Sequence, residues 1–149
     1  VLYKQALLGA AWATTLVPLD VTMTEIVTEQ HVARMVAAGT PVATFVAAIS
    51  QFYFDHYGVS SYGRRCSPCH DAVAAAVLTG DVVPTVFPRI DVVVDCTDGP
   101  GRGATICDTR ARYRGFHGVP EGRCRVALAT AGTFSDQLVA RLIGAPASP

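Results

Sequence analysis

The sequence predicts an α/β fold in which a mixed, Rossmann-like sheet carries flanking helices and a β-hairpin. Apolar residues recur at helical spacing through 28–57, they alternate with mostly polar residues from 86 to 108, and a short strand pattern at 14–21 precedes both. No internal repeat or linker interrupts the 149 residues. The length therefore predicts a single domain that spans the whole chain.

The first predicted strand is followed by a capped helix. Residues 14–21, T-T-L-V-P-L-D-V, read as a short buried strand that carries Asp20 and Thr22 to its end. Thr28 then provides a helix cap, and Gly39 provides a stop. We expect a helix between these two residues.

The next segment has the most regular helical period in the chain. It begins at Pro41 and ends before Gly58, and we expect one of its faces to be buried. That face consists of apolar and aromatic residues: Val42, Phe45, Val46, Ile49, Phe52, Tyr53 and Tyr57. Residues 58–68 are polar and Gly-rich, which predicts a mobile loop before a helix that begins near His70.

A β-rich segment completes the chain. The turn D-G-P-G at 98–101 separates two period-two segments and predicts a hairpin whose second strand covers 104–108. Residues 124–129 predict a third strand. A closing helix begins at Thr133, and the tail A-P-A-S-P ends the ordered structure.

Composition excludes several classes of partner. Half of the residues are hydrophobic, 16% are charged and the formal net charge is zero, so no basic face for nucleic acid or for an anionic membrane is expected. The apolar runs are too short to span a bilayer, and no signal peptide is recognisable, which predicts a cytoplasmic protein. The five cysteines are an odd number, which favours reduced thiols over a disulfide framework.

The stretch C-S-P-C-H-D-A at 66–72 has three interpretations. Cys66, Cys69 and His70 match the attachment pattern of c-type haem, and the two cysteines alone match half of a zinc site. Both methionines lie upstream of this stretch and no second Cys-x-x-Cys exists, which disfavours both metal interpretations. The third interpretation makes His70 and Asp71 a titratable pair at a helix start. From these two residues alone, a partly buried histidine beside an ordinary helix-start aspartate is the simpler explanation.

Four segments, taken in their order along the chain, favour the functional interpretation of His70 and Asp71. They are V-P-L-D-V-T at 17–22, Q-F-Y-F-D-H-Y-G at 51–58, P-C-H-D-A at 68–72 and R-G-A-T-I-C-D at 102–108. Together they resemble the C-terminal half of the inosine-uridine-preferring nucleoside hydrolases, and the resemblance covers about 16–143. It implies an N-glycosyl hydrolase of purine and pyrimidine salvage that splits ribonucleosides into base and ribose.

The resemblance also assigns roles to four residues. His70 would be the general acid that protonates the departing base, and Asp71 would be a ligand of a bound calcium ion. Tyr57 and Tyr53 would belong to a mobile aromatic wall around the nucleoside, although tyrosines at this spacing are equally typical of a core. These residue types suit the reaction, because an oxocarbenium-like transition state requires a bound sugar, an activated water and a protonated leaving group.

The sequence departs from the family in one major respect. The family builds its calcium site mainly from an aspartate-rich loop after its first strand, and neither that loop nor its Asn and Glu segment is recognisable here. Calcium takes six to eight oxygen ligands, so Asp71 alone cannot hold it. We therefore expect a single partial domain, 1–149, that lacks the N-terminal calcium-binding part and is active only within a complete chain.

Two alternatives remain open at this stage. The chain is either an inactive truncated remnant, which would self-associate into a homo-oligomer through exposed apolar surface, or a protein with a zinc or haem site at Cys66 and Cys69. The preferred base and sugar are left undetermined.

Overall fold

The computed structural model describes residues 1–57, 61–110 and 122–144. The predicted disordered tail and part of the predicted loop, 58–60, lie outside the described residues. The helices are α1 (Leu2–Gly9), α2 (Leu19–Thr22), α3 (Glu29–Ala38), α4 (Pro41–Tyr57), α5 (His70–Thr79) and α6 (Phe134–Leu142). The strands are β1 (Thr14–Leu16), β2 (Ile26–Thr28), β3 (Cys66–Pro68), β4 (Arg89–Ile90), β5 (Val92–Val94), β6 (Thr105–Cys107) and β7 (Cys124–Val126).

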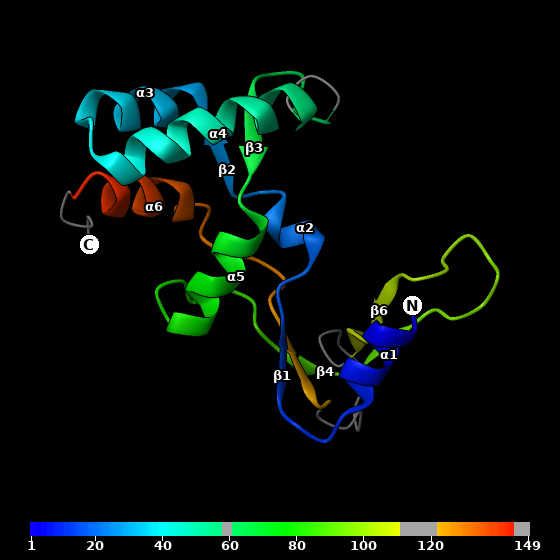
Figure 1. The fold of residues 1–149 in the computed structure, drawn as a ribbon. Helices are drawn as coiled ribbons and strands as arrows, with labels where there is room; N and C mark the ends of the chain where they lie inside the picture. Colours follow the sequence, from blue (N-terminus) through cyan, green and yellow to red (C-terminus); the bar gives the residue numbers. More distant parts are fainter. Residues whose placement is uncertain (58–60, 111–121, 145–149) are drawn as a thin grey trace.

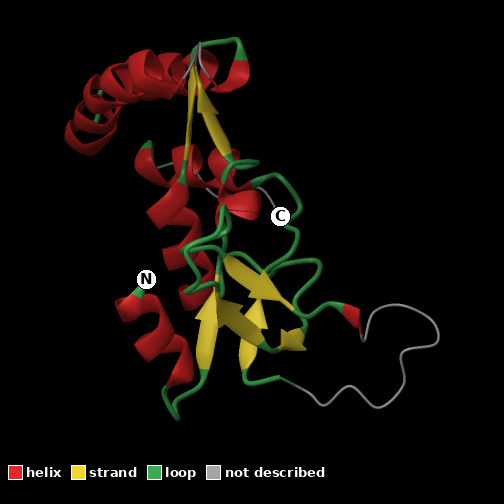
Figure 2. Ribbon diagram, turned by 90° about the vertical axis from the view of Figure 1, so that its right-hand side faces the viewer, coloured by secondary structure: helices red, strands yellow, loops and turns green. Residues whose placement is uncertain are grey.

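The strands of the described residues form three small sheets. The order of the largest is β1-β7-β4, with β1 and β7 parallel and β4 antiparallel to β7, so this sheet is mixed as predicted. β2 pairs with β3 and β5 pairs with β6, both antiparallel. Figures 1 and 2 show α3, α4 and α6 gathered at one end of the molecule and the mixed sheet at the other. The β2–β3 ribbon, α2 and α5 lie between the two ends.

Each end of the molecule has its own hydrophobic core. At the helical end, Met35 of α3, Phe54 of α4 and Val139 of α6 pack together and are fully buried. At the sheet end, Leu8 of α1 and Val126 of β7 belong to a second cluster. A third cluster joins α5 to α6 in the middle. The site region thus lies between two cores and depends on the connections between them.

The first strand is shorter than predicted. β1 ends at Leu16, and the chain turns at Pro18 into the short helix α2 instead of continuing as a strand through residue 21. Proline lacks a backbone N–H and fixes φ, which makes it a poor strand residue but a good residue at a helix start. Asp20 is exposed on α2, whereas Thr22 is buried at its end.

Helix α3 confirms its predicted caps. The backbone N–H of Thr28 donates to Nδ1 of His31 over 3.0 Å, which forms one half of a capping box. Gly39 ends the helix with φ at +64°, a conformation that favours glycine.

Helix α4 forms as predicted, but the prediction of its buried face is wrong. The buried residues of α4 are Ala43, Ala47 and Phe54, which face α3 and α6. Large members of the predicted face point outward: Phe45 is 64% exposed and Phe52 is 73% exposed. Small alanines allow the close approach of neighbouring helices, so tertiary packing selects the alanine face over the larger apolar one.

The ribbon of β2 and β3 was not predicted. Residues 66–68 were expected to be part of a loop, but they form β3, whose central residue Ser67 pairs with Val27 of β2. Both strands have only three residues, which is too short for a period of two to be visible in the sequence. This ribbon places Cys69 and His70 directly beyond its end.

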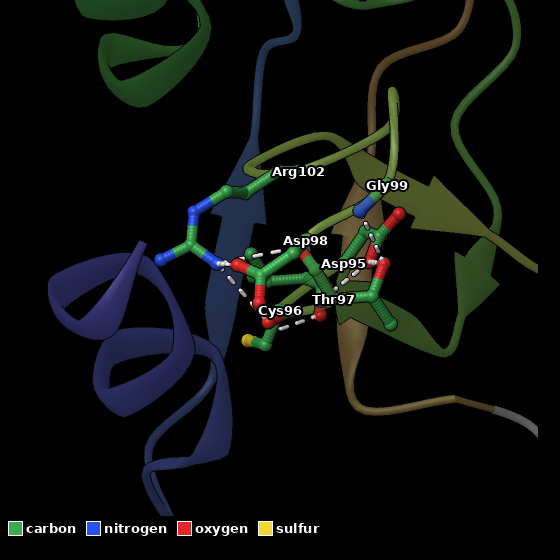
Figure 3. Close-up of polar contacts among 7 residues, drawn as sticks. Asp95, Cys96, Thr97, Asp98, Gly99 and Arg102 are labelled. Atoms are coloured by element: carbon green, nitrogen blue, oxygen red, sulfur yellow. Dashed lines mark hydrogen bonds and ion pairs between the residues drawn. The ribbon is translucent and has the colours of Figure 1, made fainter.

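The predicted hairpin of β5 and β6 is confirmed. Its turn is shown in Figure 3, where Asp95 accepts hydrogen bonds from the backbone and the hydroxyl of Thr97 over 2.8 and 2.7 Å. These two bonds lower the pKa of Asp95. Arg102 closes the turn with an ion pair to Asp98 at 2.6 Å. A Cβ atom on Gly101 would lie 2.5 Å from a carboxylate oxygen of Asp95, so a side chain at this position would require that carboxylate to shift.

No helix within the described ranges is long and apolar enough to cross a membrane.

A buried carboxylate links the middle of the chain to its last helix. Glu25 lies between α2 and β2, is 1% exposed, and accepts a hydrogen bond from the hydroxyl of Thr130 over 2.6 Å. It also accepts one from the backbone N–H of Phe134, the first residue of α6, over 3.2 Å. Its own backbone carbonyl accepts the N–H of Cys69 over 2.9 Å. Glu25 therefore holds together three segments that are far apart in sequence.

We predict that Glu25→Ala lowers the free energy of unfolding by about 3 kcal/mol, because it leaves two buried donors without an acceptor. Glu25→Gln retains one oxygen and should cost roughly 1 kcal/mol. Urea denaturation followed by far-UV circular dichroism measures both. The matched control is Glu29→Ala, since Glu29 is a glutamate whose side chain is exposed and should change stability by less than about 1 kcal/mol. Equal losses at both glutamates would contradict this role of Glu25.

Candidate active site

The candidate site is centred on His70, the first residue of α5. Its ring is half-buried, and its Nδ1 lies 2.7 Å from Oγ1 of Thr22, a hydrogen-bond distance. Thr22 ends α2 and is 4% exposed. The ring centroid of Tyr57, the last residue of α4, lies 5.9 Å from that of His70 with the planes tilted by 59°. Three helices therefore meet at one imidazole.

The two predicted tyrosines lie side by side. The rings of Tyr53 and Tyr57 are one helical turn apart on α4, with centroids 6.5 Å apart and planes 10° from parallel. Tyr57 is half-buried against His70, whereas Tyr53 is 47% exposed. The structure thus brings His70, Tyr57 and Tyr53 into one row of rings that runs from the interior to the surface.

Asp71 follows His70 on the first turn of α5, and its side chain is exposed. The part of the chain that the structure describes contains no group of three or more His, Cys, Asp or Glu side chains that could hold a metal ion. Asp95 and Asp108 serve other purposes, since Asp95 bonds to the hairpin turn and Asp108 is paired with Arg110. The pairing with Arg110 lowers the pKa of Asp108 to about 2. These residues do not fit a calcium site on their own.

The two cysteines of the Cys-x-x-Cys pattern do not form a thiol site. Cys66 lies within β3 and is fully buried, whereas Cys69 precedes α5. Three residues of nearly extended chain separate Cα atoms by roughly 10 Å, beyond the reach of a disulfide. Burial also raises the pKa of the Cys69 thiol, which disfavours the thiolate that a metal or an oxidant requires.

Two site residues were missed by the sequence analysis. Thr22 was expected to lie at a strand end but was given no role, although its hydroxyl is the hydrogen-bond partner of His70. The hydroxyl of Tyr62 donates to the backbone carbonyl of Met23 over 2.9 Å and so attaches the segment after α4 to the end of α2. Burial is the main cause that raises the pKa of Tyr62. No local pattern signals either contact.

A separate cavity of about 490 Å³ lies between α5 and α6. Its lining is mostly apolar, with Ala72, Phe134 and Leu138 on its walls and Arg141, paired with Asp81, at its edge. None of the four residues with predicted roles lines this cavity. The candidate site is therefore distinct from it.

Comparison with solved structures assigns the fold to the class of nucleoside hydrolases. The chain superposes on the purine-preferring ribonucleoside hydrolase from Gardnerella vaginalis with a TM-score of 0.73 and 24% identity, over 94% of this chain and 42% of that one. A plant nucleoside hydrolase, the PpNRh1 enzyme, gives a TM-score of 0.75 at 16% identity, over 96% and 45%. The chain thus spans less than half the length of these relatives.

The sequence identifies the family directly. Residues 4–133 match the model of the inosine-uridine preferring nucleoside hydrolases, and the chain belongs to this family. No curated protein sequence matches it.

We predict that a thiol-reactive probe labels Cys96 before Cys66 or Cys69 in the folded protein. Cys96 is exposed, Cys66 is buried, and the raised pKa of Cys69 lowers its thiolate fraction near neutral pH. Peptide mass spectrometry after brief labelling ranks the three sites, and labelling in urea gives the fully reactive control. Early modification of Cys69, or its recovery in a disulfide with Cys66, would contradict the structural role of these residues.

Proposed function

We propose that this chain is the C-terminal part of a nucleoside hydrolase domain and that it supplies the general acid of ribonucleoside hydrolysis. The observation that carries the proposal is the setting of His70 at a helix start, where its ring contacts the hydroxyl of Thr22 and lies beside the ring of Tyr57. Membership of the nucleoside hydrolase family supports the reaction. The substrate class is ribonucleosides, and the products are the free base and ribose.

The proposed reaction breaks the bond between C1′ of the ribose and a nitrogen of the base. The bonding electron pair leaves with the base, which takes a proton from the His70 imidazolium. The oxygen of a water molecule joins C1′ and loses a proton to the solvent or to another basic group. A histidine titrates near neutral pH, so it suits the transfer of a proton to a leaving group.

Tyr57 and Tyr53 are proposed to form one wall of the nucleoside site. Their rings are nearly parallel and continue outward from His70, which supports a surface against which a base can stack. A base that stacks on Tyr57 would lie beside the imidazole that protonates it. The row of rings does not discriminate between purines and pyrimidines.

Asp71 is proposed as one ligand of the calcium ion that the family implies. Its exposed carboxylate is a suitable oxygen ligand for a hard cation. The other described residues bring no further acidic groups together beside it, so the ion requires ligands from elsewhere in the fold. The mechanism proposed for this chain has no step that passes through the ion.

An inactive fragment is the second candidate. Its support is the span of less than half of each solved relative, together with large apolar side chains such as Phe45, Phe52 and Leu78 that are more than half exposed. Contiguous exposed apolar surface promotes association. This candidate predicts a self-associating protein without ribose release.

We predict that a chimera in which this chain replaces the corresponding part of the Gardnerella vaginalis hydrolase releases ribose from nucleosides, and that His70→Ala lowers its kcat by roughly 10²- to 10⁴-fold. The loss follows from a leaving base that departs unprotonated. A reducing-sugar assay with inosine and uridine measures turnover. His31→Gln is the control, since His31 lies on α3 in the capping box.

Unchanged turnover of His70→Ala in an active chimera would refute the role of His70. A chimera that folds and releases no ribose would instead support the inactive fragment.

We predict a different effect for Tyr57. Tyr57→Leu removes the stacking surface and should raise KM by roughly 10-fold, whereas Tyr57→Phe keeps the ring and should stay within about 2-fold of the parent. Steady-state kinetics on the same chimera separates KM from kcat. A larger KM change in the phenylalanine variant than in the leucine variant would contradict a stacking role.

A further inference from the structure

We propose that Thr22 is a positioning residue that holds His70 in the tautomer with its proton on Nδ1 and reserves Nε2 for proton transfer. The catalytic consequence rests on the proposed function, but the tautomer itself does not. The proposal concerns a residue that has no charge and lies 48 positions before His70 in the sequence.

One assignment of donors and acceptors satisfies both contacts of the Thr22 hydroxyl at the same time. Oγ1 lies 2.7 Å from Nδ1 of His70 and 3.3 Å from the backbone carbonyl of Leu19. A hydroxyl has one proton to donate and two lone pairs to accept with, whereas a carbonyl oxygen only accepts. With the Thr22 proton directed to Leu19, the hydroxyl oxygen accepts the Nδ1–H of His70. Both contacts are then satisfied.

The same arrangement is satisfied in both charge states of the ring. When the imidazole is protonated, Nδ1–H donates to Thr22 and the second proton is on Nε2. When the proton leaves Nε2 for the departing base, the Nδ1–H bond to Thr22 and the bond from Thr22 to Leu19 are both kept. The ring therefore acts as an acid without rotating and without rearranging its buried contact.

Two hydrogen bonds hold the backbone carbonyls of Thr22 and Met23, which makes the contact well defined. The backbone N–H of Glu25 donates to the carbonyl of Thr22 over 3.4 Å, and Tyr62 holds the adjacent carbonyl of Met23. Thr22 is nearly fully buried, so its hydroxyl does not exchange this partner freely with water. The hydrogen bond that one ring nitrogen of a histidine makes sets which of the two nitrogens carries the proton.

The test is nitrogen NMR spectroscopy of the 149-residue chain itself. Two-bond 1H–15N correlation spectra are recorded well above the ordinary pKa of histidine, and the signals of His70 are identified by their loss in His70→Ala. The expected result is a protonated Nδ1 and an unprotonated Nε2 in the parent chain. A parent chain with its proton on Nε2 overturns the proposal without any variant.

Two substitutions isolate the hydroxyl. Thr22→Val keeps the shape but removes the acceptor, so the ring should shift toward the Nε2–H form that a free histidine side chain prefers in water. Thr22→Ser keeps the hydroxyl and should retain the Nδ1–H signature. A valine variant that folds and keeps the parent tautomer overturns the proposal.

Kinetics on the active chimera provides an independent readout. Thr22→Val should lower kcat by roughly 10- to 100-fold with little change in KM, and Thr22→Ser should restore most of the loss. A valine variant with parental kcat contradicts the positioning role. A chimera without ribose release refutes the proposed function instead, while the NMR result still decides the tautomer.

Discussion

The arrangement of the site depends on the hydrogen bonds that the buried carboxylate of Glu25 accepts. A carboxylate removed from water has a large desolvation cost, and two hydrogen bonds together with the positive end of α6 offset it. Because α6 packs against α3 and α4, fixing its first residue also fixes the layer that contains Tyr57. The backbone carbonyl of Glu25 holds Cys69, and His70 is the next residue. One residue therefore connects the layer that carries the aromatic rings with the start of the helix that carries His70, the proposed general acid.

The same connection explains why the Cys-x-x-Cys-His pattern is structural here. Cys66 belongs to a strand whose partner, β2, begins directly after Glu25, and Cys69 is held by Glu25 itself. Burial suits Cys66 for packing, and it raises the pKa of the Cys69 thiol, which disfavours a thiolate there. The histidine of the pattern, His70, lies beyond the end of β3 at the start of α5, and its side chain is only half-buried. Residues 66–70 thus combine an interior support, which includes Cys66, with the proposed general acid His70 at its edge.

The features that could be predicted from the sequence are those determined by nearby residues. The helix cap at Thr28, the stop at Gly39 and the hairpin turn each depend on contacts within a few positions, and all three predictions are confirmed. The buried face of α4 depends on which neighbours pack against it, and periodicity alone selected the wrong face. In the same way His70 was recognisable as a helix start. Its partner Thr22 was not, since that contact joins residues 48 positions apart.

The accessibility of the site residues limits what this chain does alone. General acid catalysis is effective where water is excluded and charges are weakly screened. In this structure Asp71 is exposed and Tyr53 is nearly half exposed, so the outer side of the site faces solvent. The solved relatives have more than twice the length of chain that matches here. We propose that the further chain of a complete hydrolase covers this side and supplies oxygen ligands beside Asp71. The proposed acid His70 and the proposed aromatic wall therefore border a solvent-facing side of this chain, and we infer that efficient hydrolysis requires a further protein surface opposite them.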